Sequence, residues 1–284
     1  MRFWHVAALA TLLLIFGCKQ ETQVVGGKNR VKYYRTVVSL SPSTTEIVPG
    51  KAITMQLIGR TESCNSPSTI SGVEVVMKGV KPNYERIKFL NPDVVLLDPD
   101  LFTADELKKF QDLKLDVTEV KGNTVDEFVQ SLYLLGGKLG IEVTIMDYVD
   151  EIRRATQTAK GSAPTNKPKV AIMMPSTHGG HMIAGTKSFL ADVIRIGGGE
   201  PVGPESTKFE PVSAENFLQW NPSILITAGD PTPVQRDPRF ATVDAIKLGQ
   251  VAGLKDDIVL RKGGRVHELI KRVAAFIKLP KLSN

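Results

Sequence analysis

The stretch Asn83-Tyr-Glu-Arg-Ile-Lys-Phe-Leu-Asn-Pro-Asp-Val-Val-Leu-Leu-Asp98 decides how the rest of the chain is interpreted. It predicts a short capped helix, a turn at Asn91-Pro92, and then a buried apolar strand from Val94 to Leu97. The same plan returns as Ser213-Ala-Glu-Asn-Phe-Leu-Gln-Trp-Asn-Pro-Ser-Ile-Leu-Ile-Thr227. In both copies a capping residue is followed two positions later by Glu, and Asn-Pro follows that Glu at the same interval. A plan that is used twice predicts two similar lobes, and the cleft between lobes is a common place for a ligand.

A second pair of similar stretches lies upstream of these two helices. Val38-Ser-Leu-Ser-Pro-Ser-Thr44 resembles Ala171-Ile-Met-Met-Pro-Ser-Thr177. Each stretch precedes its own Glu, Glu85 or Glu215, by a similar interval. The order of both pairs supports a structural plan that occurs once in each half of the chain.

The amino terminus has the pattern of a secretory signal. Met1-Arg2 precedes an uncharged run from Val6 to Gly17, which is too short to span a bilayer core. The end of the run, Ile15-Phe-Gly-Cys18, resembles the lipobox of bacterial lipoproteins, although Phe16 is bulkier than is usual there. We therefore expect residues 1–17 to be a signal peptide, Cys18 to carry lipid, and residues 18–34 to form a tether on the periplasmic or extracytoplasmic face of the cell envelope. An uncleaved anchor or a chance cysteine is the alternative.

Composition excludes several classes of protein. The 284 residues are 42% hydrophobic and 23% charged, which is typical of a globular chain and not of disorder. The formal net charge of +6 is scattered, without a basic stripe or a nucleic-acid motif, so we expect no nucleic-acid partner. If Cys18 carries lipid, Cys64 is left without a disulfide partner. The length is sufficient for two domains with separate cores.

Strand and helix patterns alternate along the chain, which predicts a mostly parallel α/β architecture. Thr103 and Thr124 each begin a capping box. Residues 35–140 are expected to form an amino-terminal lobe, 141–160 a connecting helix, and 168–284 a carboxy-terminal lobe. A helix between lobes would act as a stiff connector, so we expect little domain closure on ligand binding. We expect residues 228–240 to be a long loop.

At this point the sequence resembles the periplasmic-binding-protein family that serves importers of vitamin B12, haem and ferric siderophores. The resemblance covers about residues 35 to 280, through Thr36–Glu46, Leu57–Cys64, Gly197–Val202 and both Glu-to-Asn-Pro repeats. It implies two Rossmann-like lobes joined by a single long helix, the class III fold of these proteins. It also implies a monomeric lipoprotein that captures a metal chelate and delivers it to an ABC permease dimer with its ATPase. Leu57–Cys64 looks most like the cobalamin branch, which makes cobalamin the first choice, with haem and ferric siderophores as alternatives.

Candidate site residues fall into two groups. We expect the chelate to meet loop residues at the cleft, although several of these could instead cap helices or complete the core. His178, with His181, could offer imidazole to a metal, and Cys64 could offer a thiolate. The cleft candidates are Ser43, Thr44, Cys64, Phe102, His178, Phe209 and Arg236. Glu85 and Glu215 are the docking candidates, since the resemblance implies that one Glu per lobe contacts the permease; favourable interaction with the helix dipole is the alternative.

Other classes of function find less support in the sequence. The chain has no Gly-x-Ser-x-Gly elbow, phosphate loop, His-Glu-x-x-His pair or dinucleotide fingerprint. A secreted metal-dependent hydrolase would need clustered imidazoles and carboxylates, whereas only three histidines follow residue 18. We expect no enzyme, no cofactor and no resident metal; a purely structural lipoprotein is the third class.

Overall fold

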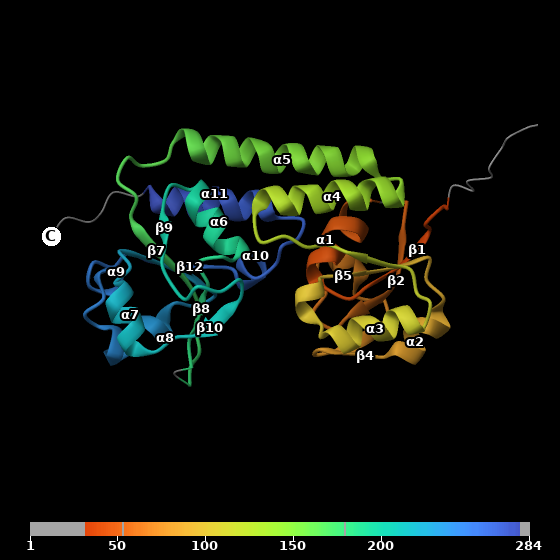
Figure 1. The fold of residues 1–284 in the computed structure, drawn as a ribbon, viewed down its shortest axis with the longest axis horizontal. Coiled ribbons are helices and arrows are strands. Elements are labelled where there is room, and N and C mark those ends of the chain that lie inside the picture. Colours follow the sequence, from red (N-terminus) through yellow and green to blue (C-terminus); the bar gives the residue numbers. More distant parts are fainter. Residues whose placement is uncertain (1–31, 53, 179, 279–284) are drawn as a thin grey trace, which may run out of the picture. The chain divides into compact units, whose positions relative to one another are not determined.

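The computed structural model describes residues 32–52, 54–178 and 180–278. From Tyr33 onward the chain forms one compact unit, which contains two six-stranded sheets. Helices surround the sheets, and Figure 1 shows the two lobes that result. The predicted class, two α/β lobes joined by one long helix, is confirmed.

The amino-terminal lobe is built on a sheet with the strand order β4-β3-β2-β1-β5-β6. All neighbouring strands are parallel except β3 and β4. The strands are β1 (Thr36–Ser39), β2 (Gln56–Thr61), β3 (Val75–Lys78), β4 (Lys81–Pro82), β5 (Val94–Leu97) and β6 (Val117–Glu119). The helices are α1 (Pro42–Lys51), η1 (Ser68–Ile70), α2 (Tyr84–Leu90), η2 (Pro99–Leu101), α3 (Ala104–Asp112) and α4 (Val125–Leu139).

The carboxy-terminal lobe has the strand order β10-β8-β7-β11-β12, and β9 pairs with β7. Strands β7, β9, β11 and β12 are parallel, whereas β8 runs antiparallel to both β7 and β10. The strands are β7 (Lys169–Met174), β8 (Met182–Ala184), β9 (Glu200–Pro201), β10 (Phe209–Pro211), β11 (Ile224–Ala228) and β12 (Val251–Leu254). The helices are α6 (Phe189–Ile196), α7 (Ala214–Trp220), α8 (Thr232–Gln235), η3 (Pro238–Phe240), α9 (Asp244–Lys247), α10 (Asp256–Val259) and α11 (Val266–Ile277). Residues 228–240 are therefore not one continuous loop, because α8 and η3 begin within them, each with a proline in its first turn, where proline is favourable.

The connection between the lobes is the 20-residue helix α5 (Glu142–Gly161). Figure 1 shows α5 lying along α4 of the first lobe and α11 of the second. Its buried face includes Ile145, Tyr148, Val149 and Ile152, which recur at helical spacing. Gly136 of α4 allows the close approach, since a side chain there would meet Ile145 at 3.1 Å.

The largest hydrophobic cluster is shared by the two lobes. It runs from Val37 and Val94 of the first sheet, through α4 and α5, to Val170 and Ile226 of the second sheet. This shared cluster follows from α5, which packs against α4 of the first lobe and α11 of the second. Each sheet also has its own smaller cluster on its other face.

Candidate ligand-binding site

A cavity of about 290 Å³ lies between the lobes. The first lobe contributes Asp98, Asp100 and Leu101, which follow the carboxyl end of β5, and Asn123. The second lobe contributes the amino-terminal end of α6, residues 207–209, and Val259, Leu260 and Lys262. Ligands of open α/β sheets commonly bind beyond the carboxyl ends of the strands, which is where Asp98, Asp100 and Leu101 lie relative to β5.

The cavity has an apolar wall on each side. Leu101 and Leu260 come from opposite lobes, and their exposed fractions are 43% and 42%. Phe209, at the start of β10, is partly buried beside them. Two half-exposed leucines that face one cavity from different lobes provide apolar surface that a ligand between the lobes would cover.

A polar contact between the lobes crosses the same cavity. The Lys262 ammonium donates to Asp100 Oδ2 at 2.8 Å and lies 3.6 Å from Asp98 Oδ2. Asp98 is buried, and this burial raises the pKa of its carboxyl although the charge of Lys262 opposes the rise. Lys208 also lines the cavity, so two lysines and two aspartates balance in charge there.

The described residues that line this cavity include no histidine, cysteine, methionine or tyrosine. These are the side chains that most often bind the metal of a chelate as axial ligands. Across the described residues, no group of three His, Cys, Asp or Glu side chains is placed to hold a metal ion. The cavity thus offers apolar contact and hydrogen-bonding groups, and its described lining residues include no soft or imidazole ligand for a metal.

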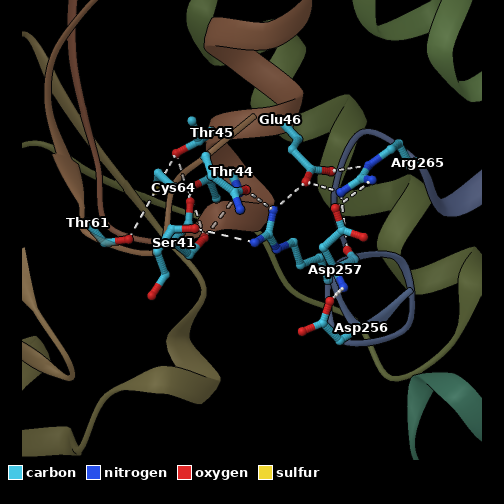
Figure 2. Close-up of polar contacts among 12 residues, drawn as sticks. Ser41, Thr44, Thr45, Glu46, Thr61, Cys64, Asp256, Asp257 and Arg265 are labelled. Carbon is cyan, nitrogen blue, oxygen red and sulfur yellow. Dashed lines mark hydrogen bonds and ion pairs between the residues drawn. The ribbon is translucent and has the colours of Figure 1, made fainter. Parts of the chain in front are cut away.

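Next to the cavity, a network of carboxylates and guanidinium groups joins α1 to the segment before α11. Figure 2 shows Glu46 facing Arg265, with Asp257 beside the guanidinium group. Glu46 is buried, and its carboxylate accepts hydrogen bonds from Arg261 at 3.0 Å and from Arg265 at 2.7 Å. The hydrogen bond to Glu46, and after it that to Asp257, raise the pKa of Arg265.

The sequence-predicted residues of the first lobe are placed differently from one another. Thr44 is fully buried in α1, where its hydroxyl lies 2.7 Å from Ser39 Oγ and its amide donates to Ser41 Oγ at 3.1 Å. Cys64 is buried with Sγ 3.0 Å from Thr45 Oγ1 and 3.1 Å from Thr61 Oγ1, and Figure 2 shows this cluster at the end of α1.

Thr44 and Cys64 therefore do not line the cavity, contrary to the expectation. Their polar atoms instead contact buried hydroxyl groups at the ends of β1, β2 and α1. Ser43 is also buried, and it lies against Gly263 of the other lobe. Phe102 packs its ring edge-on to Phe110 at 5.9 Å, at the border of a core cluster, whereas its neighbour Leu101 lines the cavity.

The second lobe places Phe209 in the cavity, as the sequence suggested, but it does not place His178 or Arg236 there. Arg236 lines a separate hollow within this lobe, together with His181 and Asp237. The His181 ring is buried, and its Nδ1 accepts from the Ser176 amide, so its proton is on Nε2, 3.3 Å from Asp237 Oδ2. His178 is exposed, with Nδ1 close to Thr177. The two imidazoles thus have different hydrogen-bond partners.

Glu85 and Glu215 occupy matching positions. Each is the second residue of a seven-residue helix, each is exposed, and neither has an ion pair among the described residues. Figure 1 shows α2 and α7 on the side of the sheets away from α5.

The sequence did not identify Asp98, Leu101, Leu260 or Lys262 as site residues. A usable signal existed for the first two, since Asp98-Pro-Asp-Leu101 directly follows the predicted strand from Val94 to Leu97. Leu260 and Lys262 had no such signal, because they follow a four-residue helix that no periodicity reveals. Cys18 lies outside the described residues, and among those residues no helix has the length and apolar character needed to cross a bilayer.

The chain is similar to known proteins in both sequence and structure. The sequence model of a family described as "Periplasmic binding protein" matches residues 37–258. An uncharacterized ABC transporter substrate-binding lipoprotein, YvrC of Bacillus subtilis, is 22% identical over 251 residues, which are 86% of this chain and 80% of YvrC. The high-affinity heme uptake system protein IsdE of Staphylococcus aureus is 25% identical over 177 residues, which are 61% of this chain and 60% of IsdE. The crystal structure of the periplasmic vitamin B12 binding protein BtuF of Vibrio cholerae superposes with a TM-score of 0.76 at 20% identity, covering 88% of this chain and 99% of BtuF.

Proposed function

Because the chain belongs to the periplasmic binding protein family, we propose that it captures cobalamin between its lobes and delivers it to an ABC permease with its ATPase. It is a transport substrate-binding protein and not an enzyme. One observation carries the choice of site: Leu101 and Leu260 are half-exposed on opposite lobes and face the same cavity as Phe209.

The residues of the cavity favour a chelate whose metal is already fully coordinated. No imidazole, thiol, thioether or phenol is among the described lining residues, whereas haem bound by a protein commonly takes such an axial ligand. Cobalamin and ferric siderophores bring their own ligands. Haem is the second candidate because IsdE, a relative of this chain, is a heme uptake protein.

The charges of the cavity separate cobalamin from anionic siderophores. Lys208 and Lys262 are balanced by Asp98 and Asp100, so the wall has no excess of positive charge for an anion. Asn123, Ser188 and Thr207 add neutral hydrogen-bonding groups, which suit the amide side chains of a corrinoid. A corrinoid is larger than 290 Å³, so part of the ligand would extend out of the cavity toward the cleft mouth.

Titration with cyanocobalamin, haemin and a ferric hydroxamate siderophore tests this proposal. We expect cyanocobalamin to bind most tightly, and Phe209→Ala to weaken its binding by about 1–3 kcal/mol through lost apolar contact. Phe89→Ala is the matched control, since Phe89 is 75% exposed on α2 and does not line the cavity. Tighter binding of haemin with a shifted Soret band would identify haem, and not cobalamin, as the ligand. Equal affinities of Phe209→Ala and Phe89→Ala for cyanocobalamin would refute the site.

The membrane attachment and the docking of the permease remain parts of the same proposal. Lipid on Cys18 is supported by the short apolar run that ends at Gly17. Membrane fractionation of Cys18→Ala should show the protein released or unprocessed, and an unchanged distribution and mass would contradict lipidation. Glu85 and Glu215 are proposed to contact basic residues of the two permease subunits, because both carboxylates are exposed and unpaired among the described residues.

A further inference from the structure

The segment Arg261-Lys-Gly-Gly-Arg265, which we name the basic loop, belongs to the second lobe but bonds mainly to the first. Arg261 donates to Asn65 Oδ1 at 2.8 Å and to the Ser63 carbonyl at 3.3 Å, in addition to Glu46. Lys262 pairs with Asp100 and Asp98. Three side chains of five consecutive residues therefore bond across the boundary between the lobes.

Glu46 is the residue on which the basic loop converges. Its side chain is 4% exposed, and it accepts from both guanidinium groups, with Arg265 bonding to each of its oxygens. Asp257 accepts from Arg265 at 3.0 Å, so two carboxylates balance two guanidinium groups. A buried carboxylate needs this compensation, and in turn it fixes the position of the groups that compensate it.

The backbone of the basic loop is held as closely as its side chains. A side chain at Gly263 would lie 2.6 Å from Glu46 Oε2, and one at Gly264 would lie 2.7 Å from the Glu46 carbonyl oxygen. On the other side, the buried hydroxyl of Tyr148 in α5 donates to the Gly263 carbonyl and accepts from the Val266 amide. The basic loop is thus enclosed between α1 and α5 and has little freedom to shift.

The same loop forms one end of the ligand cavity. Lys262 lies within it, and Leu260 immediately precedes it; both line the cavity, whereas Glu46 does not. A displacement of Arg261 or Arg265 would therefore move the ammonium and the leucine that face the ligand.

We propose that Glu46 is a positioning residue for ligand binding, which acts through Arg261 and Arg265 to hold Lys262 and Leu260 in place at the cavity. The part that concerns affinity rests on the proposed function, whereas the anchoring of the basic loop does not. The same geometry indicates the class of ligand. The ligand would carry an uncharged oxygen acceptor, such as an amide carbonyl, which accepts a hydrogen bond from Lys262 in place of Asp100 or together with it.

Hydrogen exchange in the absence of ligand tests the anchoring. We expect Glu46→Gln to accelerate exchange of the peptide that covers residues 261–266, because Arg261 and Arg265 lose their shared carboxylate. Glu74→Gln is the matched control, since Glu74 forms an equally close pair with Arg86, at 2.6 Å and 2.8 Å, but within one lobe. Unchanged exchange in Glu46→Gln overturns the proposal whatever the ligand is.

Binding of cyanocobalamin tests the action through Lys262. We expect Glu46→Gln to weaken binding roughly tenfold. Because the effects of coupled residues are non-additive, Lys262→Met should reduce the affinity little further in the Glu46→Gln background. In the Glu74→Gln background, Lys262→Met should reduce the affinity as much as it does in the wild-type protein. Equal losses from Lys262→Met in both backgrounds would mean that Glu46 is merely structural. Absence of binding by the wild-type chain would refute cobalamin as ligand and leave the exchange result to decide the anchoring.

If Glu46→Gln does not fold, Gly264→Ala provides the same test, because the added methyl group collides with the Glu46 backbone. Gly72→Ala is its control, since a side chain there meets nothing within 4 Å. Faster exchange of residues 261–266 in Gly264→Ala alone supports the proposal, and equal exchange in the two variants contradicts it.

Discussion

Helices α2 and α7 show how closely two distant parts of this chain can agree. Both are seven residues long, and the side chains of Asn83 and Ser213 accept from the amide three positions later at 3.0 and 3.1 Å. Both end at an asparagine in the left-handed region, Asn91 with φ of 46° and Asn221 with φ of 41°. The residues between differ almost throughout, so the cap, the terminal Asn-Pro and one buried apolar position are sufficient to specify this unit.

The other repeated stretch behaves in the opposite way. In the first lobe, Ser41 caps α1 directly after β1, and Pro42 is the first helical residue. In the second lobe, β7 continues to Met174, and the chain after Pro175 turns back into β8, antiparallel to β7. Pro-Ser-Thr occurs in both, but a hydroxyl cap alone does not produce a helix when His178-Gly-Gly-His181 follows instead of a helix-forming sequence.

This difference explains why the two lobes do not contribute equally to the site. The first lobe has the buried hydroxyl groups of α1 at the end of its sheet, whereas the second lobe has buried His181 paired with the partly buried Asp237. Neither cluster lines the cavity between the lobes. The duplicated plan therefore predicts the scaffold better than it predicts the residues that meet the ligand.

The largest expected effect comes from the apolar position that α2 and α7 share. Ile87 and Phe217 are both fully buried two residues after their Glu, each in the private cluster of its own lobe. We expect Ile87→Ala to reduce the free energy of unfolding by about 2–5 kcal/mol and Phe217→Ala by about 3–5 kcal/mol, through lost contact and the cavity left behind. Urea denaturation followed by circular dichroism measures both.

The same pair of variants tests whether the shared core joins the lobes. Because one hydrophobic cluster runs through α4 and α5 into both sheets, we expect each variant to shift a single common transition. Two separated transitions, of which each variant moves only one, would show that the lobes unfold independently.

A smaller effect separates the two Pro-Ser-Thr stretches. Ser41 is buried and accepts from the Thr44 amide, so Ser41→Ala should cost about 1–2 kcal/mol, as expected for loss of a helix cap. Among the described residues, the Ser176 hydroxyl accepts only from the amide of exposed His178, so Ser176→Ala should stay within about 0.5 kcal/mol. Thermal unfolding of the two variants side by side is the measurement, and equal losses would mean that the stretches are equivalent after all.

The parts of the fold that the sequence predicted are those set by local periodicity and caps. The strand Val94–Leu97 has the predicted bounds, and Thr103 forms the expected capping box with Glu106. Thr124 caps α4, but Glu127 bonds to the Asn123 amide and not to that of Thr124, so only half of that box is present.

The site was less predictable because it depends on contacts between distant residues. Phe209 is predicted at the cleft because the family resemblance implies an apolar wall there, and it does line the cavity. Phe102 is predicted at the cleft because it lies in an expected loop, yet it packs at the edge of the core while Leu101 lines the cavity. One position along a short helical turn separates the two outcomes. The ion pair of Glu46 with Arg265 joins residues 219 positions apart, which no local pattern reveals.

The smallest effect on stability should come from the two carboxylates that α2 and α7 hold in common. A carboxylate in the first turn of a helix contributes about 0.3–1 kcal/mol through the helix dipole, less when exposed and screened by salt. Glu85 and Glu215 are exposed, so the double variant Glu85→Ala with Glu215→Ala should unfold near the wild-type midpoint and bind its chelate normally. That result alone would fit the helix dipole as well as docking.

The ATPase activity of the reconstituted permease separates the two explanations. If the carboxylates bond to basic residues on both subunits, loss of two pairs worth about 1 kcal/mol each should raise the concentration of receptor needed for stimulation by roughly tenfold to thirtyfold. Because rim charges act mainly on association and its salt dependence, the double variant should also respond less to added salt. Glu142→Ala is the matched control, since Glu142 is an exposed first-turn carboxylate of the connecting helix and lies outside the pair. Stimulation by the double variant at the wild-type concentration would leave Glu85 and Glu215 with no role beyond the dipoles of their helices, and the likeness of α2 and α7 would then concern folding alone.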